Sequence, residues 1–198
     1  MKTHNEFVGF FLGASMKKVL LFLVLGLCFG NSAQAYIRLE PYIGYEMGNG
    51  SNPGLSFKTS GINYGARAGW LSNAERYWIV LDYESTFDGS VEMGETASSK
   101  FTKTIISAVF GLNFIERPFR VWAGYGMDEW KIKDGSQSVM TGTAMKLGVG
   151  YTKYKPVSIN FEYFSENFNE MTDASGEKSD PETKGTSYMI SVSWPLKY

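Results

Sequence analysis

Two carboxylates that lie two residues apart, Asp82 and Glu84, are the first candidates for chemistry in this sequence, within YWIVLDYES at 77–85. Residues i and i+2 of a β-strand point to the same face, so these side chains would lie next to each other. Such a pair can act as general acid and general base, or it can bind lysine and arginine side chains. Because Lys and Arg recur at equivalent alternating positions elsewhere in the chain, we interpret the pair as part of an ion-pair network.

Histidine and cysteine are each used once, and both residues lie in the N-terminal segment, at His4 and Cys28. If that segment is removed on export, the mature chain has no imidazole with a pKa near neutrality for acid–base catalysis. It also has no thiol for disulfides, nucleophilic catalysis or metal binding. We therefore predict a protein that is not an enzyme and that has no cofactor and no metal site.

Two other sequence patterns resemble ligand sites. Glycine pairs flank one residue in GYG at 124–126 and in GVG at 148–150. Phosphate-binding glycines lie between a strand and a helix, whereas these lie inside expected strands, which favours a packing role. The acidic segment 165–185 lacks the spacing of a calcium loop, so we interpret it as a solvated surface loop; loose binding of divalent ions is the alternative.

The N-terminus has the three parts of a secretory signal peptide. Lys17 and Lys18 precede an apolar run at 19–29, and Ala33 and Ala35 form a small-x-small cleavage site. The apolar run is shorter than the roughly 20 residues that a spanning helix needs. We predict a signal peptide at 16–35 with Met16 as initiator, an upstream extension at 1–15 from a misassigned start, and a mature domain at 36–198.

The rest of the chain alternates apolar and polar residues with a period of two. This periodicity is typical of β-strands with two different faces. Eight such segments occur, of about the 9–11 residues that cross a bilayer as a tilted strand. They are residues 36–47, 62–70, 77–85, 102–114, 119–128, 141–151, 157–164 and 187–198.

The connections between these segments also alternate in length. Those near 48–61, 88–100, 130–138 and 166–185 are long and polar, and those near 72–76, 114–118 and 152–156 are short. Long loops at one end and short turns at the other are typical of an up-and-down transmembrane barrel. We therefore predict an all-β fold, an eight-stranded antiparallel barrel.

The two strand faces differ in a way that indicates which one is inside. One face combines charges of both signs with glycines, as expected where side chains from all strands converge in a narrow lumen. Its charged members, which we expect to form an ion-pair network, are Arg38, Glu40, Arg67, Asp82, Glu84, Lys103, Arg120, Asp128, Lys146 and Glu162. The other face is apolar with aromatic residues near its ends, which favours contact with lipid and its two interfaces.

The segment 36–198 thus resembles the small outer-membrane β-barrels of the OmpA/OmpX-like superfamily. Its last strand ends in an aromatic residue and is similar to the signal that the outer-membrane assembly machinery reads. In this chain that signal would consist of Tyr188, Ile190, Val192, Trp194, Leu196 and Tyr198. Pro41 and Pro195 each remove a backbone donor from the first and last strands, which must pair to close the barrel.

This resemblance implies a monomer in a Gram-negative outer membrane, in contact with lipid and lipopolysaccharide. It also implies long loops that contact host, phage or other cell-surface partners. The barrel enzymes of this kind use a histidine, which the mature chain lacks. The net charge of −1 argues against a nucleic-acid partner.

Two further functions stay open at this point. A barrel of this size could conduct ions or small solutes, although eight strands enclose a space that side chains can fill. A soluble periplasmic lipocalin-like barrel could carry an apolar ligand, but it would need the two faces inverted, with the apolar residues inside.

Overall fold

The computed structural model describes residues 35–52, 55–93, 97–133, 138–153 and 156–198. The chain separates into two units, Met1–Ala35 and Tyr36–Tyr198. The predicted upstream extension, and the predicted signal peptide up to residue 34 with Ala33, lie outside the described residues. Among the described residues, no helix is long and apolar enough to cross a membrane.

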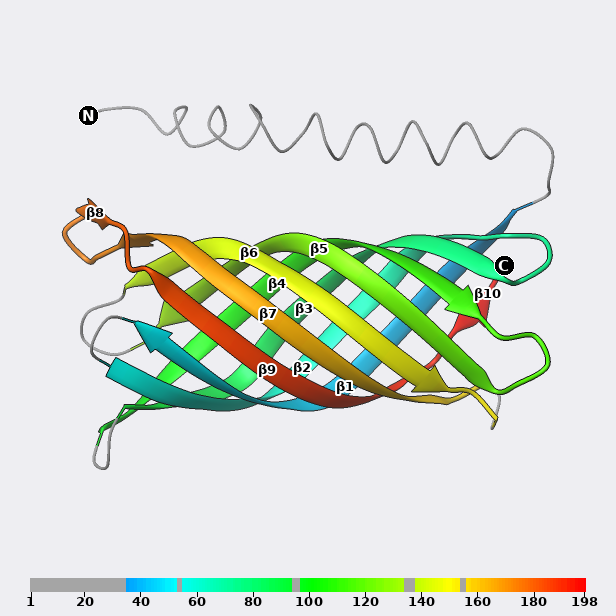
Figure 1. Ribbon diagram of the computed structural model, residues 1–198, viewed down its shortest axis with the longest axis horizontal. Coiled ribbons are helices and arrows are strands. Elements are labelled where there is room, and N and C mark those ends of the chain that lie inside the picture. Colours follow the sequence, from blue (N-terminus) through cyan, green and yellow to red (C-terminus); the bar gives the residue numbers. More distant parts are fainter. Residues whose placement is uncertain (1–34, 53–54, 94–96, 134–137, 154–155) are drawn as a thin grey trace. The chain divides into compact units, whose positions relative to one another are not determined.

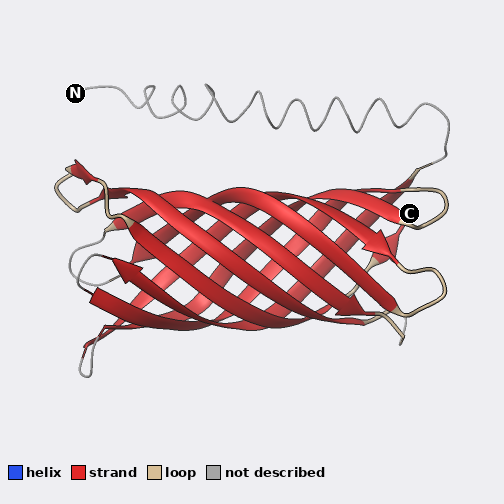
Figure 2. Cartoon of the chain, in the orientation of Figure 1, coloured by secondary structure: helices blue, strands red, loops and turns tan. Residues whose placement is uncertain are grey.

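The unit Tyr36–Tyr198 is a closed β-barrel (Figures 1 and 2). Each long strand pairs antiparallel with the next along the chain, and the last one pairs with both β7 and β1. The predicted eight-stranded up-and-down barrel is confirmed. The long strands are β1 (Tyr36–Asn52), β2 (Leu55–Leu71), β3 (Tyr77–Met93), β4 (Ala97–Asn113), β5 (Phe119–Ile132), β6 (Val139–Tyr151), β7 (Ser158–Thr172) and β9 (Thr183–Ser193). Two short strands complete the sheet, β8 (Lys178–Ser179) beside β7 and β10 (Leu196–Lys197) beside β1.

The strands are longer than the alternation of apolar residues indicated. β1, β2, β3 and β4 have 17 residues each, and only residues 53–54 separate β1 from β2. The predicted long loops at 48–61 and 88–100 are therefore wrong, because most of their residues continue the strands, whereas in the predicted loop 130–138 only residues 130–132 belong to a strand, β5. The predicted loop 166–185 shortens to 173–182, which includes β8. We call the end of the barrel that carries these four connections the loop end.

The opposite end carries the short turns after β2, β4 and β6 and the first and last residues of the barrel unit, and we call it the terminal end. The seam between the first and last strands closes in constant register, with Tyr42 opposite Ser193 and Arg38 opposite Lys197. The Trp194 N–H donates to the Pro41 carbonyl at 3.0 Å. Pro41 cannot return that bond, and Pro195 lies in the interruption between β9 and β10, so both prolines lie where the ladder is incomplete.

Candidate functional site

The barrel wall has two zones with opposite polarity. In the zone nearer the terminal end the outward side chains are apolar, as Ile37, Ile43 and Met47 show on β1, while Arg38 and Glu40 point inward and are buried. We call the outward surface of this zone the apolar band. It is formed by Ile37, Leu39, Ile43, Tyr45, Met47, Ile62, Tyr64, Trp70, Tyr77, Leu81, Tyr83, Ile106, Phe110, Phe119, Tyr125, Met127, Met145, Leu147, Val149, Ile159, Phe161, Tyr188 and Ile190.

Toward the loop end the polarity reverses along the same strands. On β1 the outward residue after Met47 is Asn49, followed by Ser51. We call this outward surface the polar collar, formed by Asn49, Ser51, Ser56, Lys58, Ser60, Glu92, Lys100, Thr102, Glu129, Lys131, Thr141, Thr143, Ser165, Asn167, Lys184 and Thr186. Inside the collar lies an apolar cluster of Phe57, Val91, Phe101, Trp130, Met140 and Phe168. Polar outside and apolar inside is the arrangement of a sheet that stands in water.

Arg67 lies at the centre of the charged layer inside the apolar band. Its guanidinium donates to both carboxylate oxygens of Glu162, at 2.6 and 2.7 Å, and to Glu40 and Asp82, each at 3.2 Å. Arg120 also donates to Glu40, at 2.7 Å for one of its two contacts. Planar guanidinium groups suit such multiple carboxylate contacts because their donors form a rigid fork.

The charged layer continues from this centre in both directions. Arg38 pairs with Glu40 toward the terminal end. On the other side, Lys146 donates to Asp82 at 2.8 Å and to Glu84 at 3.1 Å. The buried hydroxyl of Tyr42 lies 2.9 Å from Asp82 and 3.1 Å from Glu84. A continuous set of hydrogen bonds therefore links strands on opposite sides of the lumen.

Nearer the loop end, Lys103 pairs with Glu46 and with Glu166, the latter at 2.5 Å. Neither carboxylate was among the sequence candidates for the network. The sequence pattern places Glu166 in a predicted loop, but in the structure Glu166 continues the inward positions of β7, two residues after Phe164 and four after Glu162. Glu46 has the same parity as Glu40, so alternation alone could have indicated both residues.

All ten sequence candidates for the lumen are buried. Nine of them form the ion pairs described above, and Asp128 does not. Neither oxygen of the Asp128 carboxylate has a hydrogen-bond partner among the described residues, although the side chain is only 2% exposed. Among the described residues, no group of His, Cys, Asp and Glu side chains is arranged to hold a metal ion.

Tryptophan side chains fill the lumen toward the terminal end. The rings of Trp78 and Trp122 are 6.0 Å apart, and each lies over the glycine opposite it on the next strand, Gly111 and Gly148. The guanidinium of Arg38 lies 4.2 Å from the Trp78 ring. Because a Cβ at either glycine would overlap an indole ring, the glycines leave the space that the rings occupy. The charged layer is thus covered by aromatic side chains at both ends.

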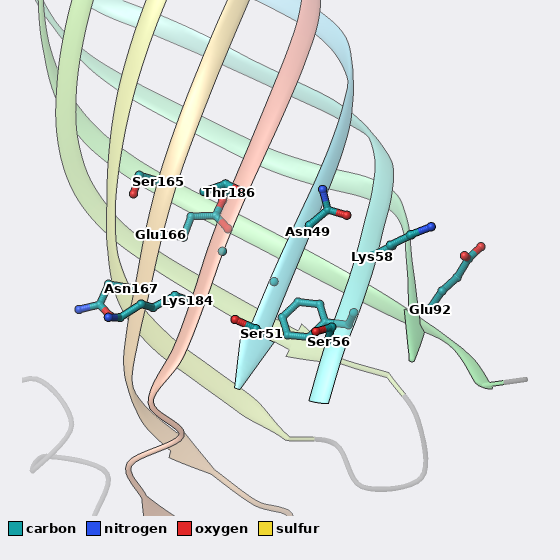
Figure 3. Close-up of a pocket in the computed structure, with 13 residues that line it drawn as sticks. Asn49, Ser51, Ser56, Lys58, Glu92, Ser165, Glu166, Asn167, Lys184 and Thr186 are labelled. Atoms are coloured by element: carbon teal, nitrogen blue, oxygen red, sulfur yellow. The ribbon is translucent and has the colours of Figure 1, made fainter. Parts of the chain in front are cut away.

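A cavity of about 780 Å³ lies at the loop end (Figure 3). Gly50 and Gly185 face each other across the β1–β9 seam within its lining. Most of the other lining residues belong to the polar collar. The full lining is Asn49, Gly50, Ser51, Ser56, Phe57, Lys58, Glu92, Ser165, Glu166, Asn167, Lys184, Gly185 and Thr186.

The candidate assembly-signal residues lie along the seam. Tyr188 and Ile190 are exposed on β9, Val192 shares their outward parity, and Trp194 follows the end of that strand. Leu196 lies on β10, and Tyr198 exchanges two backbone hydrogen bonds with Ile37 of β1, at 2.9 and 3.0 Å.

Solved structures with a similar architecture include two that cover most of this chain. The crystal structure of Neisserial surface protein A superposes with a TM-score of 0.54 at 15% sequence identity, covering 81% of this chain and 98% of that one. Ail, the attachment invasion locus protein of Yersinia pestis, crystallised with the heparin analogue sucrose octasulfate, gives a TM-score of 0.56 at 13% identity, covering 81% and 99%. The chain has the fold of small outer-membrane β-barrels. No protein-family model and no curated protein sequence matches it.

Proposed function

We propose that the protein is an integral β-barrel of a Gram-negative outer membrane, with a lumen closed by side chains and a loop end presented to the outside of the cell. One observation carries this proposal. In the zone of the apolar band the wall is apolar outside and charged inside, and in the zone of the polar collar it is polar outside and apolar inside. A hydrocarbon layer around the apolar band explains the first zone, and water around the polar collar explains the second.

The soluble lipocalin-like alternative fits this wall poorly. A carrier of apolar ligands needs an apolar cavity inside and polar side chains outside. In the band zone the inward positions instead hold Arg67, Lys146, Glu162 and their partners, while residues such as Leu81, 55% exposed, point outward. In water this outward surface would be an apolar patch far larger than soluble monomers expose.

The filled lumen supports an anchor and display role over a channel. Arg67 and Arg120 bridge to carboxylates on other strands, and Trp78 and Trp122 occupy the space beside them. Eight strands enclose an interior that side chains are able to fill. A general porin would need an open aqueous path through the same layer.

With the lumen closed, contacts with partners are expected at the loop end. The four connections and the polar collar would face lipopolysaccharide and host, phage or other cell-surface partners, and the last strand, Tyr188 to Tyr198, would be read by the assembly machinery. Ail, which shares the fold, was crystallised with a heparin analogue, a precedent for surface contacts in barrels of this size. We propose no enzymatic activity for this chain, because the barrel unit contains no histidine or cysteine.

Fractionation of the native cell and planar-bilayer recording test the proposal together. We expect the protein in the outer-membrane fraction, with heat-modifiable migration on gels and no large stable conducting openings. Recovery in the soluble periplasmic fraction would contradict the membrane assignment. Large stable openings would contradict the closed lumen and make the channel the better interpretation.

A further inference from the structure

The buried charges that the described structure places in the lumen form two groups with a different balance of sign. Around Arg67, four carboxylates and four cations contact one another, so this group is neutral as a whole. It consists of Arg38, Glu40, Arg67, Asp82, Glu84, Arg120, Lys146 and Glu162. Nearer the loop end, a second group holds three carboxylates, Glu46, Asp128 and Glu166, and one cation, Lys103. We call this second group the acidic cluster.

Asp128 lies in surroundings that do not stabilise a negative charge. Its side chain is 2% exposed, and neither carboxylate oxygen has a hydrogen-bond partner among the described residues. Its register partners are Ile105 on β4 and Gly142 on β6, which offer no polar side chain. The buried hydroxyl of Ser107, its diagonal neighbour on β4, also has no partner in the described part of the chain. A carboxylate in such a site loses its hydration and gains no hydrogen bond in return.

The charged groups that face Asp128 do not compensate its charge. They are Glu166 on β7, Lys103 on β4, Glu46 on β1 and Glu84 on β3. Three of the four repel a negative charge on Asp128. The attraction of Lys103 is already shared, because its ammonium donates to Glu166 at 2.5 Å and also to Glu46. On the other neighbouring strand, β6, Lys146 donates to carboxylates of the neutral group instead.

Apolar side chains enclose the acidic cluster on its loop-end side. Trp130 follows Asp128 by two residues on β5, and Phe168 follows Glu166 by two residues on β7. Both belong to the buried apolar cluster inside the polar collar, where their rings are 5.1 Å apart. Next to the charged groups, the buried ring of Phe164 lies 4.9 Å from the Lys103 ammonium. These rings keep water away from the acidic cluster, which makes an uncompensated charge there costly.

We propose that the acidic cluster is a proton-binding site and that Asp128 carries the proton in the folded barrel at neutral pH. A protonated carboxyl group is uncharged, so its burial beside Ile105 costs far less than burial of a carboxylate. The remaining excess negative charge is shared by Glu46 and Glu166, which both accept from Lys103. A proton fits this position better than a metal ion, because a metal ion needs several oxygen ligands and the register partners of Asp128 supply no side-chain oxygen.

Proton binding by Asp128 couples folding of the barrel to pH. An aspartate in the unfolded chain loses its proton above about pH 4, whereas the folded site keeps it, so the chain takes up a proton as it folds. The contribution of Asp128 to stability therefore decreases as the pH rises, by up to about tenfold per pH unit in the folding equilibrium constant. The inference goes beyond the proposed function, because it assigns a ligand to the closed lumen and makes closure of the lumen depend on the acidity of the surroundings.

The test uses the full barrel folded into lipid vesicles and two matched variants. Asp128→Asn removes the proposed proton site, and Asp88→Asn makes the same change at an exposed position that pairs with Lys100. Infrared spectra, with aspartate 13C-labelled at the side-chain carboxyl, identify the carbonyl band of a protonated aspartate. We expect this band at neutral pH in wild type and Asp88→Asn, and its loss in Asp128→Asn. Urea titrations from about pH 5 to pH 9 should show the folding equilibrium of wild type falling, relative to Asp128→Asn, by at least about tenfold, with Asp88→Asn following wild type.

Absence of a protonated-aspartate band from wild type would overturn the inference, as would the same pH dependence in wild type and Asp128→Asn. Stability of wild type that depends on sodium, compared with a bulky organic cation at equal concentration, and not on pH would assign the compensating charge to a metal ion instead. The labelled band decides even if Asp128→Asn does not fold, because Asp82, the other buried aspartate of the described structure, is paired with Arg67 and Lys146. A chain that inserts with heat-modifiable migration and lacks the band contradicts only the proton site, whereas one that does not insert contradicts the membrane assignment.

Discussion

Arg67 on β2 and Glu162 on β7 are joined across the lumen by two hydrogen bonds from one guanidinium nitrogen, at 2.6 and 2.7 Å. The two strands are not neighbours in the sheet, because β1 and β9 lie between them. Both side chains are fully buried. The pair therefore links parts of the wall that the backbone ladder does not connect directly, and its removal leaves a charge in the interior.

We expect Arg67→Ala to lower the free energy of unfolding by about 3–5 kcal/mol, because it leaves Glu162 without its main partner in a buried site. Urea titration of protein folded into lipid vesicles measures the change. Lys178→Ala is the control, since Lys178 pairs with Glu170 in an exposed position, where ion pairs contribute about 1 kcal/mol or less. Equal effects of the two substitutions would show that the lumen pairs do not stabilise the barrel.

Asp128 should behave in the opposite way to the other buried carboxylates. Neither of its oxygens accepts a hydrogen bond in the described structure, so Asp128→Asn changes a buried carboxyl group without removing a hydrogen bond. We expect unchanged or higher stability, whereas Glu162→Gln should lower stability by about 1–3 kcal/mol because it weakens a charge-assisted acceptor. The same urea titration distinguishes them, and a loss for Asp128→Asn as large as that for Glu162→Gln would contradict the unpaired state of Asp128.

Alternation of residue types was enough to predict the barrel, its strand order and the buried position of residues such as Arg67 and Asp82. Alternation failed to predict how far the strands extend into the polar collar, where the outward side chains change from apolar to polar. Beyond Met47 the outward residues are Asn49 and Ser51 and the inward ones are Gly48 and Gly50, a composition that resembles a loop. The strand nevertheless continues, because water accepts the polar outward side chains and Phe57 of β2 fills the space beside Gly50. Partners across the lumen, such as Arg67 and Glu162, depend on barrel closure and could not be paired from the sequence.

The contact between Trp122 and Gly148 predicts a strong dependence on side-chain size. Gly148→Ala places a methyl group in the volume of the Trp122 indole, and we expect it to destabilise the barrel by about 1–3 kcal/mol through overpacking. In a Trp122→Leu background the same substitution should have a much smaller effect. The double-mutant cycle is measured by urea unfolding in vesicles, and an equal effect of Gly148→Ala in both backgrounds would exclude this steric explanation.

The position of the membrane around the wall is tested by arginine substitutions at two outward positions. Leu81 lies in the apolar band and is 55% exposed, whereas Thr102 on β4 belongs to the polar collar. We expect Leu81→Arg to oppose insertion by about 2–4 kcal/mol, the cost of an arginine near the bilayer midplane, and Thr102→Arg to have an effect of at most about 1 kcal/mol. Folding titrations into vesicles, followed by heat-modifiable migration on gels, measure both. Similar effects at the two positions would mean that the hydrocarbon layer does not end between the apolar band and the polar collar.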